Sequence, residues 1–269
     1  MIIDRSNLFE IIGKANLKSD KDYGQNFLVE PQICEKIINS LDINDTDNVI
    51  EVGPGLGSLT HFLSLTKADV SVVDIDKRMT SFLKIVYQDS NIKIINEDIR
   101  KFDIKNANKI VANLPYNITT EVIQYFLQNA EKAERMVFMI QRETLAHFVD
   151  VEGKEYGPTS VLIHLLGNIR RLFTVKAGCF YPVPKCDSVV FEIDIDPSVN
   201  KTNAFNGFKI SQSLFLNRRK TIQNNLLNLL KDRDRVSKLC TDLNISPSLR
   251  PEQLKPEIYL SIAEYLSSK

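Results

Sequence analysis

Short apolar runs alternate with longer amphipathic segments over the first two thirds of the chain. Five of these runs have the length and the β-branched composition of buried strands, at residues 48–52, 69–74, 92–95, 109–112 and 136–140. Between them, apolar residues recur at helical spacing, as at Ile33, Ile37 and Leu41. Strands that alternate with helices predict an α/β fold with a Rossmann-like, doubly wound and mostly parallel sheet.

The pattern changes in the last third of the chain. Residues 169–176 and 188–195 have the pattern of an antiparallel strand pair. Residues 194–203 are polar and contain a proline, which is typical of a linker, and the residues beyond it are apolar at helical spacing. We therefore predict an α/β domain with an antiparallel terminal strand over residues 1–197 and a small all-α domain over residues 198–269.

Composition narrows the class of protein. The chain has 269 residues, of which 43% are hydrophobic and 25% are charged, so disordered, collagen-like and disulfide-scaffold classes are excluded. No apolar run approaches the roughly 18 residues of a membrane span, and charged residues interrupt the segment where a secretory signal would lie. The four cysteines form no C-x-x-C pair, so we expect reduced thiols in a cytoplasmic protein.

Charge is balanced overall but unevenly distributed. The net charge is zero, whereas residues 205–240 hold eight basic and two acidic residues and therefore carry +6. Arg218, Arg219 and Lys220 are consecutive, and on a helix they would span about 200° and could not all face a core. This stretch indicates either a lobe that meets an anion or a solvated helix face.

A glycine-rich turn follows the first predicted strand. Residues 51–57 read EVGPGLG, in which glycine allows a sharp turn and a close approach of a ligand to the backbone. A dinucleotide fingerprint would have glycine where Ser58 stands. Asp74 ends the second predicted strand, where a ribose hydroxyl pair is usually held, and Asp98 follows the third. The pattern favours a nucleoside ligand over a mere tight turn.

The fourth predicted strand leads into Asn113-Leu-Pro-Tyr116. This tetrapeptide offers a side-chain amide oxygen, backbone carbonyl groups and an aromatic face. An exocyclic amine of a base needs such acceptors for its N–H groups and a ring on which the base can stack. A turn with an incidental tyrosine is the alternative.

With these motifs, the sequence resembles the bacterial small-subunit ribosomal RNA adenine dimethyltransferases, within the S-adenosylmethionine-dependent rRNA adenine methyltransferase family. The resemblance covers residues 20–266 in the same order. The matching pieces are residues 24–28 (GQNFL), 51–57 (EVGPGLG), Asp98, 113–116 (NLPY), 141–143 (QRE), 180–188 (FYPVPKCDS), 218–226 (RRKTIQNNL) and 250–254 (RPEQL).

The resemblance implies S-adenosyl-L-methionine as cofactor and places it residue by residue. Asn26 and Leu28 match the segment that closes over the methionine part. Gly53 lies in the loop beneath the carboxypropyl and ribose portions. Asp74, where the family usually has glutamate, would hold the ribose hydroxyls, and Asp98 would accept the amino group of the adenine.

The resemblance also implies the chemistry of transfer to N6 of adenine. Asn113 lies between the cofactor and the target base, and Tyr116 matches the residue that stacks on a flipped adenine. Acceptors from Asn113 and the Leu114 carbonyl would hold the N–H groups so that the lone pair points at the methyl group. His61 and the other two histidines are isolated, and we expect neither a catalytic histidine nor a metal.

By resemblance the substrate is a pair of adjacent adenines in the hairpin near the 3′ end of 16S rRNA, within the 30S particle. We expect a monomer that docks on this RNA through Arg218, Arg219 and Lys220 of the helical domain.

Three alternatives remain open at this stage. An enzyme that methylates large-subunit rRNA is disfavoured by Leu114 and by residues 180–188. A non-enzymatic nucleic-acid-binding relative is disfavoured by the intact site residues. A nicotinamide dehydrogenase is disfavoured by Ser58 and by residues 113–116.

Overall fold

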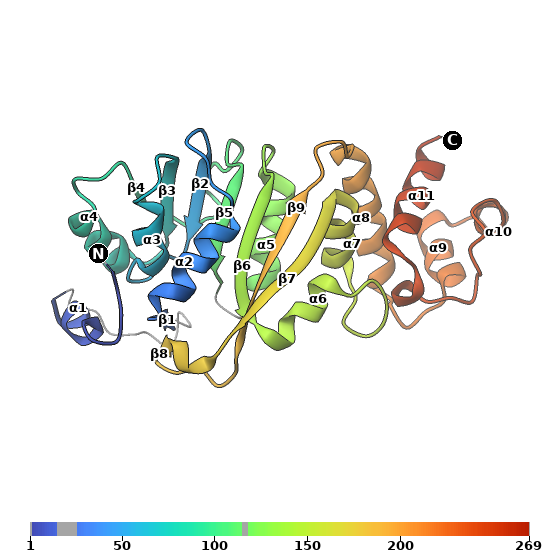
Figure 1. Cartoon of the computed structure of the whole chain (residues 1–269). Helices are drawn as coiled ribbons and strands as arrows, with labels where there is room; N and C mark the ends of the chain where they lie inside the picture. Colours follow the sequence, from blue (N-terminus) through green and yellow to red (C-terminus); the bar gives the residue numbers. More distant parts are fainter. Residues whose placement is uncertain (1, 15–25, 115–117, 269) are drawn as a thin grey trace. The chain divides into compact units, whose positions relative to one another are not determined.

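The computed structural model describes residues 2–14, 26–114 and 118–268 (Figure 1). It divides into two units, one formed by Met1–Glu143 with Arg170–Asp194 and the other by Thr144–Ile169 with Ile195–Lys269. Residues 144–169 thus group with the C-terminal helices. The assignment of functional domains to residues 1–197 and 198–269 stays a prediction.

The first unit contains a mixed seven-stranded sheet in the order β4-β3-β2-β5-β6-β9-β7. The parallel strands are β2 (Asn48–Val52), β3 (Asp69–Asp74), β4 (Lys93–Asn96), β5 (Lys109–Asn113) and β6 (Arg135–Gln141). β9 (Ser188–Ile195) pairs antiparallel with β6, and β7 (Gly167–Val175) lies beyond it. The predicted α/β sheet with an antiparallel strand is therefore confirmed.

Helices cover both faces of this sheet (Figure 1). On one face, α2 (Pro31–Ser40) joins Val137 and Met139 of β6 in a single apolar cluster. On the other face, Phe126 of α5 (Thr119–Asn129) stacks on Phe138, with ring centroids 5.7 Å apart. Because successive side chains of a strand point to opposite faces, β6 must be apolar throughout to meet both helices.

Shorter elements complete the first unit. α3 (Ser58–Leu63) follows the glycine loop. α4 (Lys77–Val86) is capped by Asp76, whose side chain accepts a hydrogen bond from the Arg78 backbone N–H. α1 (Leu8–Lys14) precedes a small antiparallel pair formed by β1 (Phe27–Leu28) and β8 (Phe180–Tyr181). This pair holds the segment that contains Asn26 and Leu28.

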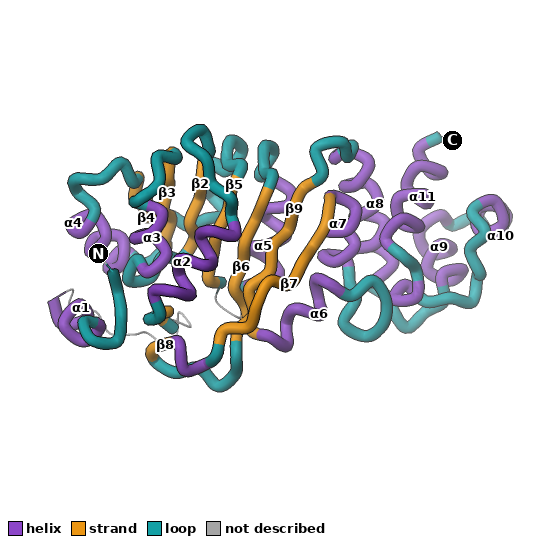
Figure 2. The backbone as a smooth tube through the Cα atoms, viewed as in Figure 1, coloured by secondary structure: helices purple, strands orange, loops and turns teal. Residues whose placement is uncertain are grey.

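The second unit is helical in its C-terminal part (Figure 2). Its helices are α6 (Ala146–Val149), α7 (Pro158–Leu166), α8 (Lys201–Phe215), α9 (Ile222–Leu230), α10 (Arg233–Asp242) and α11 (Pro256–Ser267). A 3₁₀ turn lies in this unit at Pro251–Gln253, another at Ala177–Cys179 in the first unit, and a third at Arg142–Leu145, where the chain passes from the first unit to the second. In the core of the second unit, the ring of Phe215 stacks on Tyr259 and meets the edge of Tyr156.

The predicted linker at residues 194–203 is wrong in extent. β9 continues to Ile195 and α8 begins at Lys201. The Asn200 side chain accepts a hydrogen bond from the Asn203 backbone N–H, so this polar residue caps the N-terminus of α8. Within the described ranges, every helix is too short or too polar to cross a lipid bilayer.

Candidate functional site

The predicted site residues of the first unit gather at one edge of the sheet. β2 to β5 are parallel, so their carboxyl ends meet there. The Gly53 backbone N–H donates to the Val73 carbonyl (3.0 Å), and the Glu97 N–H donates to the Asp74 carbonyl (3.1 Å). These bonds join the turns that follow β2 and β4 to the end of β3, which lies between them.

The glycine loop lies against the end of β5. Gly53 has φ of 66°, and a Cβ atom there would lie 3.8 Å from the Asn113 carbonyl oxygen. Ser58, which replaces the glycine of a dinucleotide fingerprint, starts α3 and donates its hydroxyl to the Leu28 carbonyl at 2.6 Å. The serine therefore ties the loop to the β1 segment.

Asn113 and Asn26 are brought together although they are 87 residues apart. The Asn113 Nδ2 lies 3.5 Å from the Asn26 carbonyl oxygen, a long hydrogen bond. Leu114 is buried, and its backbone N–H donates to the Met139 carbonyl at 3.1 Å. Tyr116, the predicted stacking residue, lies outside the described residues.

The two predicted carboxylates have opposite electrostatic environments. Burial raises the pKa of Asp74 to about 6, although the Asp76 and Gly55 backbone N–H groups favour its ionised form. The Arg100 side chain holds the pKa of Asp98 below its usual value by donating hydrogen bonds to both carboxylate oxygens. Asp98 is thus ionised throughout the neutral range, whereas Asp74 titrates near its lower edge.

Glu51 is a site side chain to which the sequence analysis gave no role. It is 1% exposed within β2 and accepts a hydrogen bond from the Thr60 hydroxyl at 2.7 Å. Burial and, less strongly, the charge of Asp74 raise its pKa to about 8. The signal that could have identified it is an acid inside an otherwise apolar strand that leads into the glycine loop.

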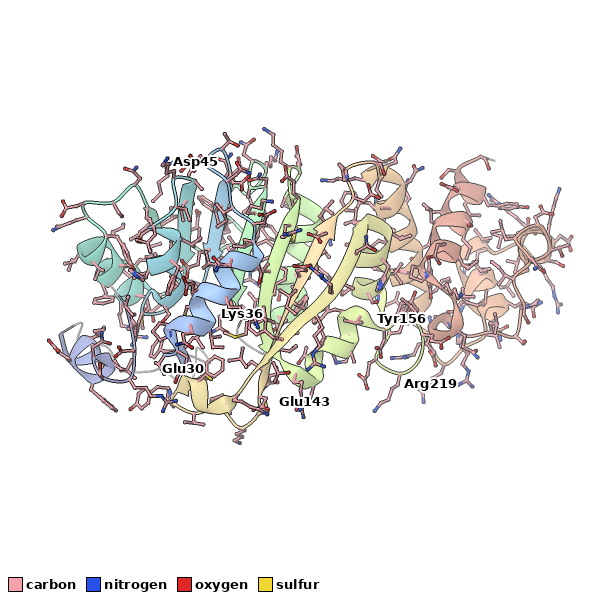
Figure 3. All side chains as sticks on the ribbon, in the orientation of Figure 1. Glu30, Lys36, Asp45, Glu143, Tyr156 and Arg219 are labelled. Atoms are coloured by element: carbon pink, nitrogen blue, oxygen red, sulfur yellow. The ribbon has the colours of Figure 1, made fainter. Side chains whose placement is uncertain are left out.

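The three predicted RNA-binding cations do not lie on a helix. Arg218, Arg219 and Lys220 form the turn between α8 and α9. The Arg218 guanidinium bonds the Glu252 carboxylate (3.3 Å) and the Lys154 carbonyl (2.9 Å) within its own unit. Arg219 and Lys220 are exposed, and Arg219 extends outward from the turn (Figure 3). The expected helical fan is wrong, because the α8 helix ends before these residues.

The donor set at the strand ends matches the chemistry of an adenosine-containing cofactor. Asp74 ends β3 and Asp98 follows the neighbouring strand β4, and their carboxylates are acceptors of the kind that ribose hydroxyls and an adenine amino group require. The Gly53 backbone leaves room for a close approach. In the part of the chain that the structure describes, no cluster of three His, Cys, Asp or Glu side chains could hold a metal ion.

Comparison with known proteins points the same way. A family model described as ribosomal RNA adenine dimethylase matches residues 16–268. A ribosomal RNA small subunit methyltransferase A of Malacoplasma penetrans is 34% identical over 265 residues, 96% of each chain. A dimethyladenosine transferase structure from Plasmodium falciparum has a TM-score of 0.77 at 24% identity, covering 90% of this chain and 98% of that one. The structure of the 23S rRNA methyltransferase ErmE has a TM-score of 0.70 at 22% identity, with 90% and 100% covered. These two structures show the methyltransferase fold.

Proposed function

The chain belongs to the ribosomal RNA adenine dimethylase family, and we propose that it dimethylates N6 of two adjacent adenines in the hairpin near the 3′ end of 16S rRNA. S-adenosyl-L-methionine supplies the methyl groups. The observation that carries the proposal is the identity of 34% over nearly the full length with a ribosomal RNA small subunit methyltransferase A.

The cofactor is held, in this proposal, by residues from four separate segments of the chain. Asp74 accepts the ribose hydroxyls, and Asp98 accepts the adenine amino group. Asn26 and Leu28 cover the methionine part, above the loop that contains Gly53. Hydrogen bonds from the Gly53 and Glu97 backbone N–H groups to the end of β3 support this assignment, because they hold the three strand ends in one arrangement.

The target adenine is positioned by Asn113 and Leu114 and stacks on Tyr116. The N6 lone pair is delocalised into the ring, so the amine is a poor nucleophile. The Asn113 Nδ2 donates toward the Asn26 carbonyl, which leaves its Oδ1 as an acceptor for an N–H of the amine. With the Leu114 carbonyl as second acceptor, the lone pair is directed at the methyl group, and alignment supplies most of the rate enhancement. The methylated N6 nitrogen loses its proton after the transfer, so no side chain has to act as a base.

Small-subunit rRNA is favoured over large-subunit rRNA by two features of the sequence. These are Leu114 and the loop at residues 180–188 (FYPVPKCDS). The curated relative that covers 96% of the chain is also named for the small subunit. The likeness to the 23S rRNA methyltransferase concerns the fold and leaves the choice of rRNA to these features.

The helical domain docks the enzyme, as a monomer, on the 30S particle in the cytoplasm. Arg219 and Lys220 are exposed and contact phosphates of the RNA. Arg218 has a structural role, since its hydrogen bonds to Glu252 and Lys154 stabilise the turn that carries Arg219 and Lys220.

The test is transfer of labelled methyl groups to 30S particles that lack these modifications, with primer extension to locate the methylated bases. We expect primer arrest at two adjacent adenines near the 3′ end of 16S rRNA. Naked 23S rRNA should accept no label, and Asn113→Ala should abolish transfer while the protein still binds S-adenosylhomocysteine. Label on 23S rRNA alone would overturn the choice of substrate.

A further inference from the structure

Arg100 bridges two carboxylates that belong to different elements of the first unit. Its Nη2 lies 2.6 Å from an Asp98 oxygen and its Nε 3.0 Å from the other. Its Nη1 lies 2.5 Å from the Glu121 carboxylate, in the first turn of α5. One guanidinium therefore joins the turn after β4 to the helix that follows the substrate segment.

A second contact joins the same two elements. The Tyr125 hydroxyl donates to the Phe102 carbonyl at 3.0 Å. Glu121 and Tyr125 are four residues apart, so they lie on one face of α5. This face of the helix packs against the segment that contains Asp98 and Arg100. The two contacts fix both the position and the rotation of the helix relative to that turn.

The place of α5 in the chain gives this bridge its importance. α5 begins at Thr119, three residues after Tyr116 in the chain, and therefore follows the segment that holds the target adenine in the proposed function. Arg100 contacts the first turn of this helix through Glu121. The near end of the segment continues β5, which is fixed in the sheet.

Asp98 is also constrained by Arg100. The Arg100 backbone N–H and side chain donate to both Asp98 oxygens, which turns an otherwise mobile carboxylate into a fixed acceptor. A carboxylate has about four acceptor positions, so capacity remains for one donor from a ligand.

We propose that Arg100 is a positioning residue that orients Asp98 toward the adenine of the cofactor and, through Glu121, aligns the segment that holds the target base. This inference rests on the proposed function, in which Asp98 binds the cofactor adenine. The bridge makes the position of the cofactor and the position of the substrate segment depend on one side chain.

The first test uses two ligands that differ in a single group. They are S-adenosylhomocysteine and its analogue in which hydrogen replaces the 6-amino group of the adenine. Calorimetry with Arg100→Gln should show S-adenosylhomocysteine bound about two- to fivefold more weakly, the range that a partly exposed ion pair supplies. The analogue should bind as it does to the wild type. Equal weakening of both ligands, or of neither, would overturn the orienting role.

Tyr125→Phe is the matched control. It removes the other contact between α5 and the same turn but leaves Asp98 and Arg100 unchanged. Both ligands should bind it as they bind the wild type. If the wild type itself failed to distinguish the ligands, the assignment of Asp98 in the proposed function would be wrong, and the orienting role of Arg100 would fall with it.

The second test separates the two arms of the bridge. Glu121→Gln removes the charge that holds Arg100 to α5 and leaves the contacts of Arg100 with Asp98. With 30S particles as substrate, kcat should fall about two- to fivefold while KM for S-adenosylmethionine stays unchanged. An unchanged kcat would show that Glu121 does not align the substrate segment, and a raised KM with unchanged kcat would place the whole effect of the bridge in the cofactor site.

Discussion

Asp74 is the residue through which pH should act on cofactor binding. Its pKa, raised by burial to about 6, means that the carboxyl group ionises between pH 5 and 7. Ribose hydroxyls donate more strongly to an ionised carboxylate than to a neutral acid. We therefore expect the affinity for S-adenosylhomocysteine to rise about fivefold over this range, the scale of a charged relative to a neutral hydrogen bond.

Calorimetric titrations at half-unit pH steps measure this dependence. Asp74→Asn should bind more weakly at pH 7 and should show no step near pH 6. Asp98 does not contribute a step there, because Arg100 holds its pKa below the usual value. A step that persisted in Asp74→Asn would assign the titration to another group.

Glu51 should make the stability of the fold depend on pH. Its pKa is about 8 in the folded chain and 4.5 when unperturbed, so between these values the folded chain holds a proton that the unfolded chain has released. As pH rises through this window, the free energy of unfolding therefore decreases by about 1.4 kcal/mol for each pH unit. Glu51→Gln removes this slope and keeps an acceptor for the Thr60 hydroxyl. In urea unfolding at pH 5, 6.5 and 8, the stability of the variant relative to the wild type should increase with pH. If the stabilities of the two proteins changed in parallel with pH, Glu51 would not be a buried neutral acid.

At the scale of elements, the glycine loop depends on the backbone of Gly57. This residue caps α3 with φ of 92°, and a Cβ atom there would lie 2.7 Å from the buried side chain of Leu83 in α4. Gly57→Ala should therefore lower the free energy of unfolding by about 1–3 kcal/mol, through backbone strain and overpacking. Chemical denaturation measures the change.

Gly13→Ala is the control for this substitution. Gly13 lies in α1 and is exposed, and apart from its own helix backbone and chain neighbours no described residue has an atom within 4 Å of the added Cβ. Alanine is favoured over glycine within a helix, so the control should be neutral or slightly stabilising. If both substitutions changed the free energy of unfolding equally, the contact with Leu83 would not be the cause of the destabilisation at Gly57.

The strands show why elements of this protein are predictable from local pattern. Each of the five predicted runs lies on a parallel strand within one residue at either end. The central strands β2, β5 and β6 are largely buried, and a strand that is buried on both faces must be apolar along its length. The polar stretch at 194–203 has no such constraint. There the same residues can be a linker or a cap, and Asn200 proved to be a cap.

At the scale of the whole molecule, the exposed cations of the second unit should control binding to the 30S particle. The double substitution Arg219→Ala and Lys220→Ala removes the two proposed phosphate contacts without breaking any hydrogen bond of these side chains that the described structure contains. The slope of log affinity against log salt should become shallower by about 2, since each neutralised phosphate releases about one counterion. Binding of S-adenosylhomocysteine should be unchanged.

Arg218→Ala separates docking from folding. It removes the ion pair with Glu252 and the hydrogen bond to the Lys154 carbonyl, so the thermal midpoint should fall while the salt slope changes little. A filter-binding titration across salt concentrations measures both variants. If the double variant bound 30S particles as the wild type does at every salt concentration, the turn between α8 and α9 would not contact the RNA.

The sequence alone determined the sheet, the order of the motifs and the family, because these depend on local periodicity and on residue types at short spacing. It also predicted that Gly53, Asp74 and Asp98 share one edge, since the carboxyl ends of parallel strands always do. Contacts between distant positions were decided only by tertiary structure. Packing buried Glu51 beside Thr60, and the fold carried Arg218 to a carboxylate 34 residues away. It also placed Arg100 between Asp98 and Glu121. Asp98 and Arg100 are two residues apart, but no local pattern encodes the pairs Arg100–Glu121 and Arg218–Glu252, because each depends on where two separately folded segments meet.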